Sequence, residues 1–365
     1  MPYSSLSPII CLFLGGTVLI EHCSSQSVPC PGNATSEDVL RGVDLKGKIA
    51  IVTGGDSGLG FAISNAFAKR GATVIIATHN QSKGEKAANE IATKTGADVR
   101  APWPLNLASL ASVRSFSQSF LASFKNLHLL INNAGISHPS VMSGDKFELV
   151  FEVDYLGHFL LTELLLPILR QNSPSRIVAV SSGAHENACE QAGWPEGCFK
   201  DFSYLPPPVV PWKHVTVHYR SGAKVVNSSS YGVAKFAQTQ HVAELARRED
   251  SFGVQAFAIT PGLALTEMSK GVDPHSPFTK MICEGQVHPS ASLPEQPCPF
   301  SATQGAAAIA YAATSESAKS GAYYSRGFAC EERPVVAHGM TAEVSGEFYT
   351  RSQEWVGVTG HSVVV

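Results

Sequence analysis

The sequence predicts an α/β fold in which a mainly parallel, doubly wound sheet of about seven strands is covered by helices on both faces. Short apolar runs of strand length alternate with longer segments of helical periodicity, which is the pattern of a parallel sheet. The first of these runs leads through a glycine cluster into a helix. We expect strands at residues 49–52, 72–77, 99–105, 127–131, 176–180, 252–260 and 322–325, and helices at 61–70, 80–95, 107–124, 147–170, 230–248, 304–314 and 343–356.

The first strand-to-helix connection reads Thr53-Gly-Gly-Asp-Ser-Gly-Leu-Gly60. Glycines let a backbone approach a ligand closely, and a helix N-terminus offers free N–H groups and the positive end of a dipole. Strand, glycine turn and helix together form the dinucleotide cradle of a Rossmann fold. The spacing differs from Gly-x-Gly-x-x-Gly, and an ordinary turn also contains glycines, so the elements that follow have to decide between the two interpretations.

The end of the second strand bears on the choice of dinucleotide. A carboxylate at this place binds the ribose of NAD, whereas a basic residue receives the 2′-phosphate of NADP. Residues 77–80 contain no Asp or Glu, and His79 and Lys83 are the basic candidates. The sequence therefore favours NADP and leaves NAD open, because His79 is equally compatible with a plain exposed position.

Two later strands end in small polar residues. The fourth runs into Asn132-Asn-Ala-Gly135, where small side chains let a turn lie under an adenine and its ribose. The fifth ends at Ser182, on the edge of the sheet where open α/β folds bind ligands. A hydroxyl at Ser182 can hold a substrate carbonyl, although capping a helix is the simpler alternative.

The helix at 230–248 places Tyr231 and Lys235 one turn apart on one face. A phenol ordinarily titrates near pH 10, and a neighbouring ammonium favours the phenolate. The pair would make Tyr231 a general acid or base near neutral pH. Tyr-x-x-x-Lys also occurs as two surface side chains, so its meaning depends on the motifs that precede it.

The sequence divides into three parts. Residues 1–41 form a signal-like or anchor segment with a linker, residues 42–357 form the domain, and residues 358–365 form a tail. Within the domain, the proline-rich segment 186–229 lacks clear periodicity, which predicts a functional loop or lid.

The N-terminal segment contains no Lys or Arg up to residue 40 and has an apolar run at 9–20. This run is shorter than the about 20 residues of a membrane span and is typical of a signal-peptide core. We expect the secretory pathway, either the endoplasmic reticulum or secretion, with membrane association through this segment. The missing basic residues leave an uncleaved anchor, or a plain extension of a cytoplasmic protein, as alternatives.

Sequons and cysteines bear on the same question. Three sequons occur: Asn33-Ala-Thr35, Asn227-Ser-Ser229 and Asn80-Gln-Ser82, the last at the expected cofactor site. Eight cysteines include close pairs in loop-like sequence, which predict local disulfides and an oxidising compartment: Cys23 with Cys30, Cys189 with Cys198, and Cys283 with Cys298. Free buried thiols in a cytosolic protein are the alternative. A net charge of −3 without a basic block argues against nucleic acid as a partner.

Together these motifs and the closing Pro261-Gly262 resemble the short-chain dehydrogenase/reductase family over about residues 42–357. Val153-Asp-Tyr-Leu-Gly-His-Phe159 is similar to the catalytic domain of WW domain-containing oxidoreductase and to its retinol dehydrogenase relatives, although no WW module is present. The resemblance implies an NAD(P)-dependent oxidoreductase that interconverts an alcohol and a carbonyl on a small lipophilic, retinoid- or steroid-like substrate. It also implies a homodimer that pairs the helices at 147–170 and 230–248.

The resemblance also assigns roles to residues. Tyr231 would donate the proton, Lys235 would support it and bind the ribose, and Ser182 would orient the carbonyl. The implied cofactor contacts are Gly54, Ser57, Gly58, Leu59, Gly60, His79, Asn106, Asn132, Asn133, Ala134, Gly135, Tyr231, Lys235, Pro261, Gly262 and Thr266.

Three residues depart from the family pattern. Asp154 stands in place of the family's fourth catalytic residue, an Asn, and a charge there would disturb a proton relay. Asn106 replaces the usual Asp near the adenine, and His79 replaces the usual NADP-binding Arg. The segment between Ser182 and Tyr231 is also longer than usual. A catalytically impaired dinucleotide-binding scaffold is therefore the alternative function.

Overall fold

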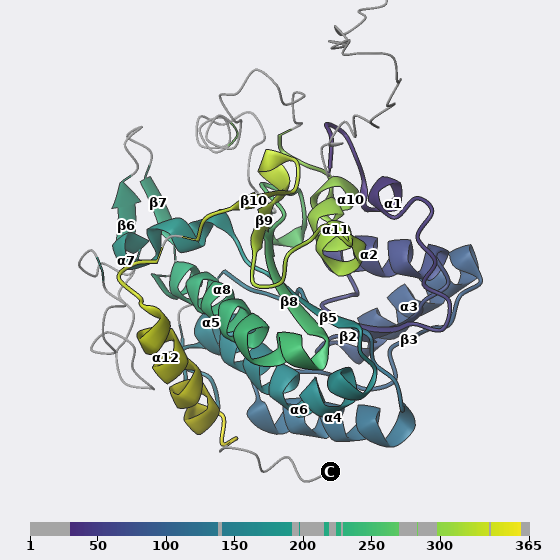
Figure 1. The fold of residues 1–365 in the computed structure, drawn as a ribbon, viewed down its shortest axis with the longest axis horizontal. Coiled ribbons are helices and arrows are strands. Elements are labelled where there is room, and N and C mark those ends of the chain that lie inside the picture. The colour runs from purple at the N-terminus through teal and green to yellow at the C-terminus, as the bar shows by residue number, and fades with distance from the viewer. Residues whose placement is uncertain are drawn as a thin grey trace, which may run out of the picture.

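A computed structural model describes residues 30–137, 141–191, 197, 215–218, 224–227, 229–269, 283, 298–335 and 337–358. Through its centre runs an eight-stranded sheet with helices on both faces (Figure 1). The strand order is β10-β9-β8-β5-β4-β1-β2-β3. The strands are β1 (Ile49–Thr53), β2 (Thr73–Ala77), β3 (Val99–Arg100), β4 (Leu129–Asn132), β5 (Ser175–Val180), β8 (Val254–Thr260), β9 (Tyr323–Ser325) and β10 (Glu331–Arg333).

The predicted doubly wound fold is confirmed, since β1 pairs in parallel with both β2 and β4 and the order of the sheet reverses there. Ligands bind at such a reversal in open α/β sheets. The sheet has one strand more than expected, because β10 adds an antiparallel edge next to β9. Ala329 and Cys330 both have positive φ and turn the chain back between these two strands.

The third strand is shorter than the predicted run at 99–105. It ends at Arg100, and residues 101–106 continue without strand pairing. Pro102 and Pro104 have no N–H to donate to a neighbouring strand, so the ladder cannot continue through them. The apolar pattern of this stretch had suggested a longer strand, and the prolines override it.

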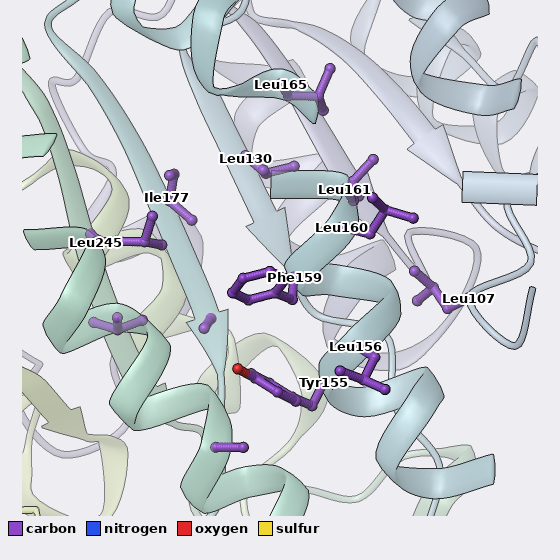
Figure 2. Packing of buried hydrophobic residues seen from close by; sticks show 14 of the residues in the cluster. Leu107, Leu130, Tyr155, Leu156, Phe159, Leu160, Leu161, Leu165, Ile177 and Leu245 are labelled. Carbon is purple, nitrogen blue, oxygen red and sulfur yellow. The ribbon is translucent and has the colours of Figure 1, made fainter. Parts of the chain in front are cut away.

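One face of the sheet is covered by helices from the middle and end of the chain. They are α4 (Leu110–Ser123), α5 (Leu149–Phe151), α6 (Gly157–Gln171), α8 (Ser229–Glu249) and α12 (Ala342–Trp355). Figure 2 shows Phe159, Leu160 and Leu161 of α6 packed near Leu130 of β4 and Ile177 of β5. This continuous apolar layer fixes α6 and α8 against the strands whose ends carry the polar motifs.

The second face is covered by α1 (Ser36–Val39), α2 (Gly58–Lys69), α3 (Gln81–Thr95), α10 (Ala302–Gly305) and α11 (Ala307–Thr314). Alanine makes up most of α11, which therefore packs closely on β5 and β8. Shorter pieces are the helical turns η2 (Gly183–Asn187), α7 (Ala188–Gln191), η4 (Asp250–Phe252), η5 (Glu267–Ser269) and η6 (Arg326–Phe328).

The long helix predicted at 147–170 is interrupted. Between α5 and α6 lies a π-helix, η1 (Glu152–Leu156), which contains Asp154. A π-helical turn inserts an extra residue into the helix and shifts the direction of the side chains that it carries. The Leu- and Phe-rich periodicity of this stretch did not reveal the interruption.

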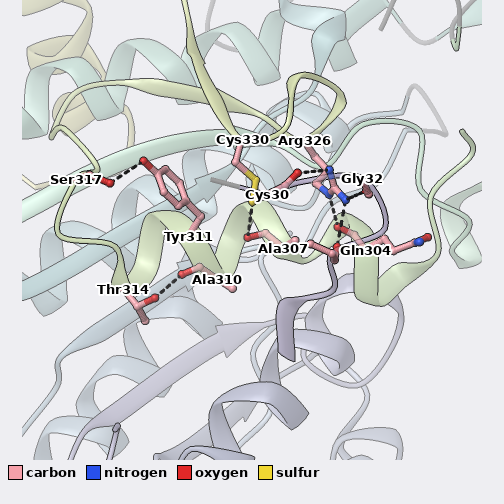
Figure 3. Close-up of a disulfide and its surroundings, with 11 residues drawn as sticks. Cys30, Gly32, Gln304, Ala307, Ala310, Tyr311, Thr314, Ser317, Arg326 and Cys330 are labelled. Carbon is pink, nitrogen blue, oxygen red and sulfur yellow. Dashed lines mark hydrogen bonds between the residues drawn. A yellow bond between two sulfur atoms is a disulfide. The ribbon is translucent and has the colours of Figure 1, made fainter. Parts of the chain in front are cut away.

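The N-terminal part of the described chain belongs to the domain. A disulfide joins Cys30 to Cys330, and α1 packs on α11, so the domain begins before the boundary predicted at residue 42 (Figure 3). The expected pairing of Cys23 with Cys30 is therefore wrong. Sequence proximity favoured a local partner, whereas folding brings β10 next to the N-terminal segment.

The other cysteine predictions have different outcomes. The disulfide between Cys283 and Cys298 is confirmed. Cys189 is also disulfide-bonded, but its expected partner Cys198 lies outside the described residues.

The predicted signal-like run at 9–20 and most of the insertion at 186–229 lie outside the described residues. The described part of the insertion contains a two-stranded antiparallel pair, β6 (Val215–His218) and β7 (Lys224–Asn227). Within the described ranges, no helix has both the length and the apolar character needed to cross a membrane.

The C-terminal helix covers part of the two helices expected to pair in a homodimer. The Tyr349 hydroxyl of α12 donates to Glu163 of α6, and Ser352 shares a hydrogen bond of 2.7 Å with Tyr155 of η1. The Arg248 guanidinium of α8 lies 4.3 Å from the ring centre of Tyr349. A homodimer through α6 and α8 stays a prediction, and it would have to use the surface that α12 leaves uncovered.

Candidate active site

A cavity of about 880 Å³ lies at the carboxyl ends of the central parallel strands. Its size lies within the usual range for cofactor and ligand sites. It is lined by Gly54, Asp56, Ser57, Gly58, Leu59, Phe61, Ala77, Thr78, His79, Lys83, Lys86, Ala87, Glu90, Leu105, Asn106, Leu107, Ala108, Asn133, Ala134, Gly135, Ile136, Leu149, Val153, Val180, Ser181, Tyr231, Lys235, Pro261, Thr266 and Met268.

The glycine turn after β1 forms one wall of this cavity. Gly54 and Gly58 have φ angles of +62° and +51°, which favour glycine. Gly60 does not line the cavity, but a side chain on it would collide with the Gly54 carbonyl and with the Asn133 amide. The three glycines therefore shape a turn whose backbone faces the cavity.

The N-terminus of α2 is left open to a ligand from the cavity side. Its N-cap, Ser57, makes no side-chain hydrogen bond to the helix, whereas Asn80 caps α3 and Ser109 caps α4. The first N–H groups of a helix need acceptors from outside it, and phosphate oxygens are suitable ones. The residues of this turn thus fit the pyrophosphate of a dinucleotide.

A buried hydroxyl locks the glycine turn to the next loop. Thr53 Oγ1 accepts from the backbone N–H groups of Asn133 and Ala134, at 2.8 and 2.9 Å. It also lies 2.9 Å from His158 Nε2. His158 Nδ1 is 3.2 Å from the carbonyl of Asp154, which must accept, so Nε2 accepts from Thr53. These bonds hold β1, the loop after β4 and η1 in one arrangement.

Basic residues gather at the far end of the cavity, beside the end of β2. His79, Lys83 and Lys86 all line it, together with the carboxylate of Glu90. His79 and Lys83 were predicted from the sequence. Lys86 was not predicted, although its helical spacing from Lys83 places it on the same face. Asn106 also lines the cavity, and its side chain accepts from Ala108 N–H at 3.1 Å.

Tyr231, Lys235 and Ser182 meet at the other end. The Lys235 ammonium lies 5.3 Å from the ring centre of Tyr231, and the Ser182 side chain is near enough to the Tyr231 phenol to affect its pKa. Tyr231 and Lys235 line the cavity on α8, and Ser182 follows β5 and also accepts from Ala184 N–H at 3.2 Å. The capping interpretation of Ser182 is therefore confirmed, and its catalytic role stays a prediction.

The ammonium of Lys235 is buried and has several partners. It forms an ion pair of 3.1 Å with Asp154 Oδ2 and donates to the Val180 carbonyl at 3.0 Å. The other carboxylate oxygen of Asp154 accepts from Ile136 N–H at 2.8 Å. Gly135 lies so close to this pair that a Cβ would sit 2.9 Å from Asp154 Oδ2, which explains why a glycine is needed there.

The electrostatics follow from this burial. Burial raises the pKa of Tyr231 and the charge of Asp154 acts in the same direction, whereas Lys235 and Ser182 oppose the shift. Burial alone would lower the pKa of Lys235, but the charges of Asp154 and Tyr231 outweigh it, so that this pKa is raised. Burial also raises the pKa of Asp154, against the effect of Lys235. The lysine therefore carries its charge throughout the physiological pH range.

Several residues expected at the cofactor lie behind the cavity wall. Asn132 is buried and donates to Thr162 at 3.0 Å, so its side chain supports α6 instead of lining the cavity. Gly262 has a φ of +69° and contributes to a turn, also outside the lining. Both were predicted next to the ligand because a motif identifies a segment and not the direction of each side chain.

Other supporting residues were not predicted. Ser181 is buried, lines the cavity and donates to the Lys235 carbonyl at 2.9 Å, which ties α8 to the end of β5. Met268 and Ile136 add apolar lining to the cavity. Ser181 stands beside the predicted Ser182 and could have been recognised, whereas Met268 has no sequence signal.

A glycine cradle, an open helix N-terminus and a tyrosine–lysine–serine group at the edge of a doubly wound sheet define the class of dinucleotide-dependent Rossmann dehydrogenases. Comparison with known proteins gives the family. The model of the short chain dehydrogenases matches residues 48–193. Human retinol dehydrogenase 11 is 36% identical over 242 residues, which cover 66% of this chain and 67% of that protein. This chain belongs to the short-chain dehydrogenase/reductase family.

Other relatives agree with this placement. Bovine dehydrogenase/reductase SDR family member 13 is 35% identical over 70% of this chain, and zebrafish (Danio rerio) WW domain-containing oxidoreductase is 36% identical over 63% of it. The matches span 60% and 52% of those proteins, respectively.

Solved structures share the fold. An uncharacterised protein from Mycobacterium paratuberculosis has a TM-score of 0.58 and 26% identity, over 87% of this chain and 96% of its own. L-sorbose reductase from Gluconobacter frateurii, solved with NADPH and L-sorbose, has a TM-score of 0.56 and 20% identity, over 77% of this chain and 95% of its own.

Proposed function

We propose that this protein is an NAD(P)-dependent oxidoreductase that interconverts an alcohol and a carbonyl on a lipophilic substrate. The observation that carries the proposal is the contact of Tyr231 with both Lys235 and Ser182 at the edge of a cavity that has a dinucleotide cradle at its other wall. Names of relatives such as retinol dehydrogenase 11 agree with this activity.

When bound, a nicotinamide dinucleotide supplies or takes up the hydride. Residues of the chain donate or accept the proton. In reduction the Tyr231 phenol donates its proton to the substrate oxygen, and in oxidation its phenolate accepts the proton of the alcohol. The Ser182 hydroxyl holds the substrate oxygen by a hydrogen bond, and the Lys235 charge stabilises the phenolate.

The dinucleotide that best fits the basic end of the cavity is NADP. His79, Lys83 and Lys86 stand beside the end of β2, where a 2′-phosphate would bind. Glu90 lines the same region, and a carboxylate there is also compatible with NAD. We expect NADPH to bind more tightly than NADH in titrations that follow nicotinamide fluorescence, and Lys86→Ala to weaken NADPH binding while leaving NADH binding little changed.

Apolar residues near Tyr231's end of the cavity support a lipophilic substrate. Ile136, Leu149 and Val153 line it, and Leu265 and Met268 are each more than two-fifths exposed on the loop after β8. Burying one methylene contributes about 0.8 kcal/mol, or roughly fourfold in kcat/KM. A series of straight-chain aldehydes should therefore show kcat/KM rising with length. A flat series would contradict a lipophilic site.

A non-catalytic dinucleotide-binding scaffold is the second candidate. The ion pair between Asp154 and Lys235 favours the scaffold, because an ammonium whose charge is balanced by a carboxylate stabilises a phenolate less. Purified protein distinguishes the two functions. Dinucleotide binding without turnover of retinal, steroid ketones and aliphatic aldehydes would support the scaffold, and turnover of any of them would support the enzyme.

A further inference from the structure

We propose that Asn33 is an N-glycosylation site, and that the domain matures in the lumen of the secretory pathway. Asn33-Ala-Thr35 is a sequon, and Asn33 is exposed on the surface in the folded domain. A glycan is bulky and solubilising, so an attachment site has to remain on the surface after folding. The site is independent of the proposed enzymatic activity.

The backbone around the sequon is held so that the Asn33 side chain faces outward. The buried guanidinium of Arg326 donates to the carbonyls of Cys30, Gly32 and Ala34, at 3.2, 2.7 and 3.1 Å (Figure 3). The carbonyls on both sides of Asn33 therefore turn inward. Because the backbone is held on either side of Asn33, the Asn33 side chain lies on the outer surface of this segment.

The amide nitrogen of Asn33, to which a glycan attaches, has no hydrogen-bond partner in the part of the chain that the structure describes. Among the described residues, its amide oxygen accepts one long bond, of 3.4 Å, from Gln304. In the transfer, a bond forms between this nitrogen and the first sugar carbon of a lipid-linked pyrophosphate oligosaccharide. The bond from that carbon to phosphate breaks, and the amide proton leaves.

The Thr35 hydroxyl is part of the sequon before folding and caps α1 after folding. The transferring enzyme reads a sequon in the unfolded chain, where this hydroxyl is free. After folding, Thr35 accepts from Asp38 N–H at 3.3 Å and donates to Asp38 Oδ2 at 2.7 Å, which caps α1. Modification would therefore precede folding, and the cap would then form without disturbing the glycan.

The disulfides support the same compartment independently. Cys30, three residues before the sequon, is fully buried and bonded to Cys330, and a second bond joins Cys283 to Cys298. Cys189 is bonded as well. Stable disulfides belong to oxidising compartments and are rare in the cytosol. A domain with this set of bonds and an exposed sequon beside one of them fits the lumen.

The structure separates Asn33 from the other sequons. The Asn80 side chain caps α3 by accepting from Lys83 N–H at 3.0 Å, and its neighbour His79 lines the cavity. A glycan at Asn80 would stand at the cavity mouth. Asn227 lies in β7, and the surroundings of its side chain are outside the described residues. Asn80, whose side chain is already used in a cap, therefore serves as the internal control.

The test expresses the full chain in mammalian cells and treats it with peptide N-glycosidase. Wild type should shift to higher mobility, and Asn33→Gln should lack one glycan relative to wild type, whereas Asn80→Gln should match wild type. Digestion in heavy-oxygen water should convert Asn33 to labelled Asp in the peptide that contains it. An unchanged mobility of wild type, or an undiminished shift with Asn33→Gln, would overturn the proposal. Because Asn33 is exposed, Asn33→Gln should fold and keep the Cys30–Cys330 bond, which nonreducing peptide mapping checks.

Discussion

Asp154 puts a carboxylate at the position where the family pattern predicts an asparagine. Its carboxylate is buried within 3.1 Å of the Lys235 ammonium, so the lysine charge that would favour the Tyr231 phenolate is partly neutralised. Two further titratable groups lie near the pair. One is the buried Glu148, whose pKa the charge of Asp154 helps to raise, and the other is His158, whose Nδ1 lies 3.2 Å from the Asp154 carbonyl. At this position an amide and a carboxylate have nearly the same shape but different charge.

Asp154→Asn should lower the pKa of Tyr231, because it removes a negative charge that raises this pKa. Alcohol oxidation needs the phenolate, so its acid limb should move to lower pH in the variant. The pH profile of kcat/KM for oxidation measures the shift. Glu347→Gln, which removes an exposed carboxylate on α12, should leave the profile unchanged. A profile for Asp154→Asn that coincides with wild type would contradict the electrostatic role.

Tyr231→Phe keeps the ring and removes the hydroxyl that we propose as the proton donor. Turnover should fall by roughly 10²–10⁴-fold, the usual contribution of a positioned acid or base. The dissociation constant of the dinucleotide should stay close to that of wild type, because the glycine turn and the N-terminus of α2 are untouched. Steady-state rates and fluorescence titration on one preparation separate the two effects. Retained turnover would exclude Tyr231 as the proton donor.

At the scale of elements, the π-helix η1 links stability to the site. It carries Asp154 and, two residues earlier, the fully buried Glu152. Burial is the main cause that raises the pKa of Glu152 to about 7, and the nearby Asp145 acts in the same direction, whereas Ser143 opposes the shift. A raised carboxyl pKa means that the folded state prefers the neutral form of Glu152.

The pKa of Glu152 predicts a loss of stability as pH rises. Its folded-state value of about 7 lies above the ordinary 4.5, so the stabilisation is fully present below about pH 4.5 and is lost as the pH rises through about 7. The shift corresponds to about 3 kcal/mol. Glu152→Gln stays neutral and should lack this loss. Urea unfolding at several pH values measures it.

The comparison needs a control at the protein surface. Glu347→Gln, at an exposed carboxylate, should follow the wild-type dependence on pH. If Glu152→Gln also followed wild type between about pH 4.5 and 7, the buried carboxyl would not be the source of the effect.

At the scale of the whole molecule, one disulfide closes the domain. The Cys30–Cys330 bond spans 300 residues and holds the N-terminal segment against α11 and β10, while the Cys283–Cys298 bond spans 15. A crosslink restricts the unfolded chain more when it closes a longer loop. The two bonds therefore should differ in what they contribute to the free energy of unfolding.

Cys330→Ala should lower the free energy of unfolding by roughly 2–5 kcal/mol, and by roughly 2–3 kcal/mol more than Cys298→Ala. Denaturant unfolding of the oxidised proteins gives both values. After reduction, the stabilities of wild type and of the two variants should converge. Equal losses from the two substitutions would show that the length of the closed loop does not govern the stabilisation.

Much of the fold was predictable because strands and helices follow from local periodicity. The apolar runs at 49–52 and 176–180 became β1 and β5, and Tyr231 and Lys235 shared a helix face as their spacing required. The expected strand at 99–105 was wrong in length because two prolines interrupt it. The π-helix around Asp154 could not be predicted, since one extra residue in a helix leaves the apolar pattern unchanged.

By itself, the sequence determined the doubly wound sheet, the glycine turn and the identities of the tyrosine, lysine and serine, because each depends on neighbours in the chain. Only the tertiary structure decided that Asp154 pairs with Lys235, that Asn132 supports α6 and that Cys30 bonds with Cys330. These three outcomes depend on which distant segments meet and on where a buried charge or thiol finds its partner. Local periodicity does not indicate which distant segments come into contact.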